Sequence, residues 1–141
     1  MRTGPSPHVS WVELRCHDGA AYPLLWRGDR AKKLAAVFEA IRAIWDMPIP
    51  ILSAYRTATY NAAVGGAPNS QHVQGLALDL APPAGVDVTT FHRLIRVRAL
   101  SGGGVFSLVG AVGVYSWGSH VDLRPRAQAS RITEWDLRAE E

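Results

Sequence analysis

Two histidines and one aspartate stand out as residues that together could bind a metal ion. His72 precedes Asp79 by seven residues, and His120 lies far along the chain beside a turn-forming glycine. Two imidazoles and one carboxylate make a three-ligand zinc site whose fourth position is left open for water. An open position is typical of a catalytic rather than a structural zinc, so the pattern predicts an enzyme that cleaves its substrate.

The surroundings of these residues strengthen this interpretation, because such a spacing of one histidine and one acid also arises by chance. His72 follows a glycine-rich loop at 65–69, and His120 begins an apolar stretch. Asp79 lies inside an apolar stretch, where a carboxylate is costly unless it is paired, hydrogen-bonded or metal-bound. The other histidines have no partners at metal-binding spacing and are expected on the surface or in the core: His8, His17 and His92.

Four further residues lie close in sequence to the predicted site. Arg56 is either a surface arginine or a guanidinium directed at a substrate carbonyl or carboxylate, and we favour the second. Ser70 either donates a hydrogen bond to substrate or caps a turn. Tyr115 and Trp117 either line a cleft or pack. The remaining tryptophans are interpreted as packing residues: Trp11, Trp26, Trp45 and Trp135.

Asp122 has two alternative roles. It lies two residues after His120, so in a strand the two side chains share a face. Asp122 is therefore the nearest candidate for a general base, or else a partner that orients the imidazole of His120. The positioning role is slightly favoured.

Hydrophobic periodicity predicts the elements that hold these residues. One helix is expected at 30–46, capped by Asp29, and a second from Asp87 to about position 100. A short helix or turn is expected at 57–64. Strands are expected at 51–54, 76–80, 111–115 and 120–124, with a tight turn at 117–118. This pattern predicts an α+β fold with a small antiparallel sheet.

Composition sets the limits of these predictions. A chain of 141 residues with 19% charged and 48% hydrophobic residues is typical of one globular domain, expected at 10–141 after a flexible arm at 1–9. The one cysteine excludes an intrachain disulfide. No apolar run suits a signal peptide or a membrane span, so we expect synthesis in the cytoplasm and action after lysis or assisted release. The net charge is +3, but the basic residues do not follow the pattern of a nucleic-acid-binding module, so no nucleic-acid partner is expected. The protein is expected to be a monomer.

Several motifs, in this order, resemble those of the M15 zinc peptidases, which include D-alanyl-D-alanine carboxypeptidases and endolysins. They are Ser53-x-x-Arg56, Ser70-x-His72 with Asp79, and His120-x-Asp122. The resemblance implies zinc held by His72, Asp79 and His120, with Arg56 as an electrostatic clamp. It also implies a fold shared with hedgehog-type domains and a peptidoglycan stem peptide as substrate, cut as a D,D-carboxypeptidase or an endopeptidase.

The chain departs from the family pattern at one position. Many members carry an acid three residues before the final histidine, where it acts as the base, but this chain has Trp117. The base is then unassigned, with Asp122 as the leading substitute. The alternative function is a zinc-containing module that binds muropeptides with weak or no catalysis.

Overall fold

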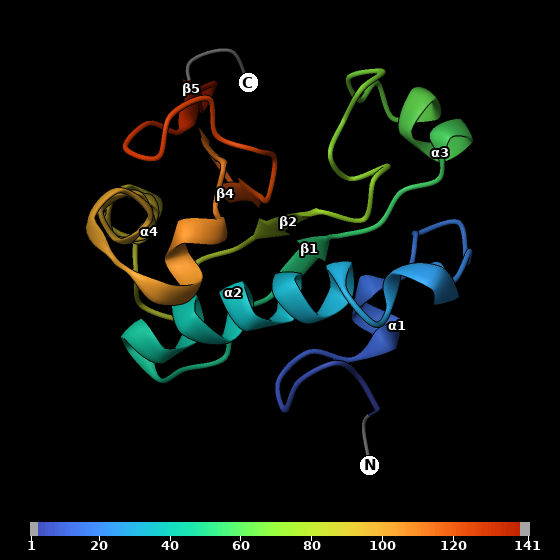
Figure 1. The fold of residues 1–141 in the computed structure, drawn as a ribbon, viewed down its shortest axis with the longest axis horizontal. Coiled ribbons are helices and arrows are strands. Elements are labelled where there is room, and N and C mark those ends of the chain that lie inside the picture. Colours follow the sequence, from blue (N-terminus) through green and yellow to red (C-terminus); the bar gives the residue numbers. More distant parts are fainter. Residues whose placement is uncertain (1–2, 139–141) are drawn as a thin grey trace.

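The computed structural model describes residues 3–138, in which helices pack against a five-stranded sheet (Figure 1). The helices are α1 (Trp11–Leu14), α2 (Arg30–Trp45), α3 (Ala58–Ala63) and α4 (Val88–Ser101), with 3-10 turns η1 (Leu24–Trp26) and η2 (Gly104–Leu108). The strands are β1 (Ile51–Ser53), β2 (Ala77–Leu80), β3 (Ala111–Tyr115), β4 (Gly118–Asp122) and β5 (Thr133–Asp136). The predicted α+β class is confirmed.

The two long helices form where the apolar period predicts them. In α2 the inward residues Leu34, Phe38 and Ile41 are fully or almost fully buried. Asp29 is the N-cap residue, but the predicted side-chain cap is wrong, because its carboxylate pairs instead with Lys33 at 3.0 Å. No helix within residues 3–138 is long and apolar enough to cross a bilayer.

The sheet has the strand order β1-β2-β4-β3-β5. Three of its pairings are antiparallel as predicted, but β5 pairs with β3 in parallel, and β5 itself was not predicted. The reason is the return path of the chain. After β4 a loop at 123–132 brings the backbone back to the start of β3, so β5 runs in the same direction as β3.

The two faces of the sheet differ in their contents. Leu78 and Leu80 of β2, with Val121 of β4, belong to the hydrophobic core that also includes Phe38 of α2 and Ile95 of α4. Because side chains alternate along a strand, the intervening residues point to the other face. That face is the one that carries the polar residues singled out in the sequence.

Residues 3–9, expected as a loose arm, contact α2. The Ser6 hydroxyl donates to a carboxylate oxygen of Glu39 at 2.6 Å, and the backbone N–H of His8 donates to the same oxygen at 2.9 Å. Val9 is buried in the core.

Candidate metal centre

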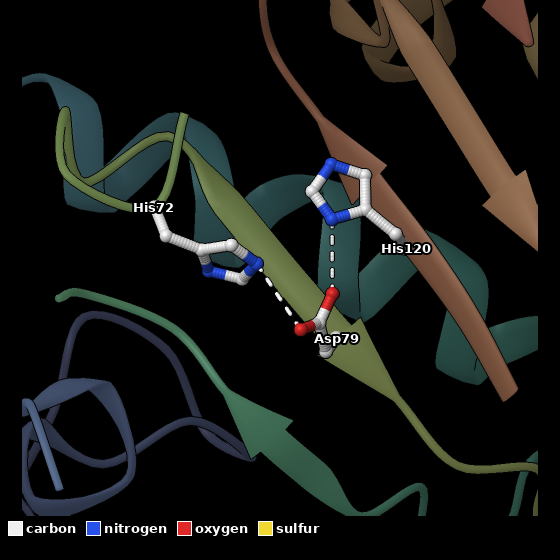
Figure 2. A group of neighbouring side chains, drawn as sticks. All are labelled: His72, Asp79 and His120. Atoms are coloured by element: carbon white, nitrogen blue, oxygen red, sulfur yellow. Dashed lines mark hydrogen bonds and ion pairs between the residues drawn. The ribbon is translucent and has the colours of Figure 1, made fainter. Parts of the chain in front are cut away.

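His72, Asp79 and His120 converge on one point of the polar face. His72 lies in the loop before β2, Asp79 within β2 and His120 within β4, and Figure 2 shows both rings directed at the carboxylate. The sheet register places Asp79 opposite His120. His72 Nε2 lies 3.1 Å from Asp79 Oδ2, and His120 Nδ1 lies 2.9 Å from Asp79 Oδ1. One potential ligand atom from each residue lies within 4.8 Å of the others.

The loop before β2 holds the His72 ring in place. Nδ1 of His72 donates to the carbonyl oxygen of Ala54 at 2.6 Å, which leaves Nε2 facing the cluster. The backbone N–H of Arg56 donates to the carbonyl of His72 at 3.1 Å. A buried hydroxyl, that of Tyr22, donates to the carbonyl of Gly75 at 2.7 Å where the loop turns. The ring orientation is thus set by backbone groups.

His120 is held by a different kind of partner. Its Nε2 lies 2.8 Å from Asp122 Oδ2, and the same oxygen accepts from Arg124 Nη2 at 2.7 Å. The indole of Trp135 lies against the His120 ring, with centroids 5.1 Å apart. Gly113 makes room for this indole, since a Cβ there would lie 2.2 Å from its nitrogen. His120 therefore presents Nδ1, and not Nε2, to the cluster.

The ionisation of the cluster follows from these contacts. Burial alone would raise the pKa of Asp79, but hydrogen bonds from His120 and His72 outweigh burial and hold this pKa below its usual range. Burial alone would lower the pKa of His120, but hydrogen bonds to Asp122 and Asp79 raise it. The pKa of Asp122 is lowered because its bonds to His120 and Arg124 outweigh its burial. In the metal-free protein both carboxylates are therefore ionised.

The cluster fits a divalent metal ion by the chemistry of its donors. Two imidazole nitrogens and a carboxylate oxygen are a common zinc ligand set. The second nitrogen of each ring is already held, by the Ala54 carbonyl for His72 and by Asp122 for His120. Such partners fix the tautomer and orientation of metal-binding histidines. The three predicted ligands are thus brought together as a group that could hold a metal.

Arg56 is held beside the cluster by three polar side chains, of which Asn61 is the one not named in the sequence analysis. Its Nη2 lies 3.4 Å from Asp79 Oδ2, its Nε donates to the Ser53 hydroxyl at 3.2 Å, and its Nη1 donates to Asn61 Oδ1 at 3.3 Å. Asn61 is buried and also donates to the carbonyl of Ala67 at 2.8 Å. Asn61 thus links the arginine to the glycine-rich loop.

A cleft of about 730 Å³ opens over the cluster. Besides the three predicted ligands, it is lined by every predicted substrate-binding residue: Arg56, Ser70, Tyr115 and Trp117. Tyr115 and Trp117 stack, with ring centroids 4.6 Å apart. Asp122 is not among the lining residues and is 0% exposed.

Several cleft residues were missed by the sequence analysis, among them a tryptophan and an arginine. Trp135, interpreted as a packing residue, lines the cleft, and so does Arg124. The local signal for Trp135 was Gly113 of β3, whose missing side chain makes room for a large ring from the neighbouring strand β5. A local signal also marks Arg124, because in the predicted strand at 120–124 it shares a face with His120 and Asp122.

The comparison with known families identifies the class of protein as a peptidase. Residues 7–114, more than half of the chain, match the family described as Peptidase M15. The chain belongs to this family. The matched region includes Arg56, His72 and Asp79 but ends before His120, which joins the site through the pairing of β4 with β2. No curated protein was found to match the chain.

Proposed function

We propose that this protein is a zinc-dependent peptidase that hydrolyses a peptide bond in peptidoglycan stem peptides. The observation that supports this most directly is the convergence of His72, Asp79 and His120 at the base of an open cleft in a chain of the peptidase M15 family. A zinc ion held by these three residues would supply Lewis-acid polarisation of the peptide carbonyl and lower the pKa of water.

Arg56 has the position expected of an electrostatic clamp. Its guanidinium borders both the cluster and the cleft, and Ser53 and Asn61 hold it in one orientation. A preorganised cation stabilises negative charge as it develops on the carbonyl oxygen, without the cost of reorganising at that moment. Arg56 therefore contributes to the transition state more than to binding of the ground state.

Asp122 is better suited to positioning than to proton transfer. Both of its oxygens accept hydrogen bonds from Arg124, one of them also faces His120, and the side chain is fully buried. A general base must reach the proton it removes directly or through one water molecule. Asp122 thus orients His120 from behind, as a carboxylate does in many metal sites.

A second candidate function is a muropeptide-binding module without turnover. The cleft lining favours this function. Among the described residues that line the cleft, Asp79 carries the one carboxylate, and Trp117 occupies the position where many family members carry the acid that acts as the base. The Tyr115–Trp117 stack provides a flat aromatic surface for binding.

Digestion of purified peptidoglycan, followed by mass spectrometry of the fragments, separates the two functions. The zinc-loaded protein should release fragments that identify the bond cut, and a chelator should stop the release until zinc is restored. Cleavage that persists in chelator contradicts zinc dependence. Bound muropeptide without new fragments at full zinc loading identifies the binding module.

A further inference from the structure

Arg124 is a second guanidinium that lines the cleft, and it follows β4, whereas Arg56 follows β1. Within residues 3–138 its hydrogen bonds all run to Asp122, and those of the guanidinium use Nε, at 2.9 Å, and Nη2, at 2.7 Å. The guanidinium also lies over the ring of Trp135, 5.4 Å from its centroid. These contacts leave it little freedom, although it lines the cleft.

A guanidinium held in this way still has donors to offer. It carries five N–H groups, and the bonds to Asp122 use Nε and Nη2 on one edge. The N–H groups of Nη1 remain for another acceptor. An arginine can pair with two carboxylates along different edges, whereas a lysine presents a single point charge.

Charged and ionisable side chains form one continuous chain of contacts across the sheet. Arg56 contacts Asp79, Asp79 contacts His120, His120 contacts Asp122, and Asp122 contacts Arg124. The chain of contacts runs from the segment after β1, across β2 and β4, to the segment after β4. Among the described residues lining the cleft, two guanidiniums thus accompany one carboxylate, and a divalent ion would add further positive charge. Such a cleft favours an anionic ligand.

We propose that Arg124 is a specificity-determining residue that binds a carboxylate of the peptide substrate, while Arg56 acts at the bond to be cut. This inference rests on the proposed function, because it takes a stem peptide as the ligand. A stem pentapeptide supplies the required group in two places, the α-carboxylate of its γ-linked glutamate and its C-terminal carboxylate.

The test compares three peptides on the zinc-loaded protein. They are L-Ala-γ-D-Glu-L-Lys-D-Ala-D-Ala, the same peptide with isoglutamine in place of glutamate, and the same peptide as its C-terminal amide. Affinity is measured by calorimetry where a peptide is not cleaved, and as KM and kcat where it is. Amidation of the carboxylate that Arg124 binds should weaken binding about tenfold or more, as for other hydrogen bonds to charged groups.

The variant Arg124→Gln should remove this discrimination, so that it binds all three peptides about equally. Arg138→Gln is the matched control. It removes the same charge from an exposed arginine that pairs with Asp136 and does not line the cleft, so discrimination should persist. Should Arg124→Gln fail to fold, the amidated peptides still decide the question on the wild-type protein.

The inference is overturned if the wild-type protein binds the three peptides equally, or if Arg124→Gln keeps the discrimination. If Arg124→Gln slowed the hydrolysis of all three peptides equally and also weakened zinc binding, Arg124 would be a positioning residue for Asp122 and not a specificity-determining residue. Cleavage without discrimination contradicts this inference alone. Discrimination without cleavage supports it and contradicts the peptidase proposal, and no binding of any peptide contradicts both.

Discussion

The two faces of the central sheet are built on opposite principles. On the face toward α2 and α4, Leu78, Leu80 and Val121 are buried among apolar side chains. On the other face, residues of the same strands carry charge, and each buried charge has a partner of opposite sign: Asp79, His120 and Asp122. Burying a charge together with a partner of opposite sign contributes little net stability. Most of the stability of the fold must therefore come from the apolar face that packs against α2 and α4.

The largest effect is expected from removing a ligand on the charged face. In His72→Ala the cluster loses one of its three donors, so zinc content and peptidase activity should fall together to background. Elemental analysis and a peptide hydrolysis assay measure the two. His8→Ala, which removes an exposed imidazole bonded to Glu39, should change neither. Activity that survives in His72→Ala without metal would contradict the proposed centre.

The apolar face should respond in the opposite way. Leu78→Ala leaves a cavity in the core that also contains residues of α2 and α4, so the free energy of unfolding should fall by about 2–5 kcal/mol. Zinc bound per folded molecule should not change. Denaturant titration and elemental analysis test both points, with the partly exposed Leu100→Ala, expected to cost less than about 0.5 kcal/mol, as the control. Loss of zinc from folded Leu78→Ala would show that the two faces are not separable.

Asp122→Asn sharpens the comparison within the charged face. If Asp122 orients His120, zinc affinity should fall about 10–100-fold, and saturating zinc should restore activity. A competition titration with a zinc chelator gives the affinity. Asp136→Asn, at an exposed aspartate paired with Arg138, is the control. Unchanged zinc affinity with activity lost at saturating zinc would instead identify Asp122 as the base.

Tyr22 connects the apolar face to the loop that carries His72, and its effect should be the smallest. Burial raises the pKa of its hydroxyl above the ordinary value of 10.0. A raised pKa in the folded state means that its contribution to stability is complete below pH 10 and is lost as the pH rises further. Wild-type stability should therefore decline on the alkaline side.

Tyr22→Phe should lower stability at neutral pH by about 1 kcal/mol, through loss of the bond to the Gly75 carbonyl, and should flatten the alkaline decline. Thermal unfolding across pH measures both effects. An equally steep decline in Tyr22→Phe would assign the pH dependence to another group.

The elements of the apolar face were largely predictable from sequence, because burial leaves a local pattern. The spacing of Leu34, Phe38 and Ile41 predicted α2, and the alternation of Leu78 with Asp79 predicted β2. The strand β5 was missed because Thr133, Glu134 and Asp136 are exposed and show no apolar alternation. Its pairing with β3 is set by the path of the preceding loop, which no local pattern encodes.

The residue types of the site were predictable, but the partnerships within it were not. Asp79 and His120 are 41 residues apart, and the register of β2 with β4 makes them neighbours. The place of Trp135 likewise depends on a long-range pairing, that of β5 with β3. Asp122 shares a face with His120 by strand periodicity alone, yet its burial and its bonds to Arg124 appear only in three dimensions.

The two histidines of the cluster differ in reach. His72 offers Nε2, the far nitrogen of its ring, whereas His120 offers Nδ1, the near one. An asparagine oxygen is as many bonds from its Cα as Nδ1, and a glutamine oxygen is as many bonds as Nε2. An amide that is to keep an oxygen at the same reach as the lost nitrogen should therefore be asparagine at position 120 and glutamine at position 72.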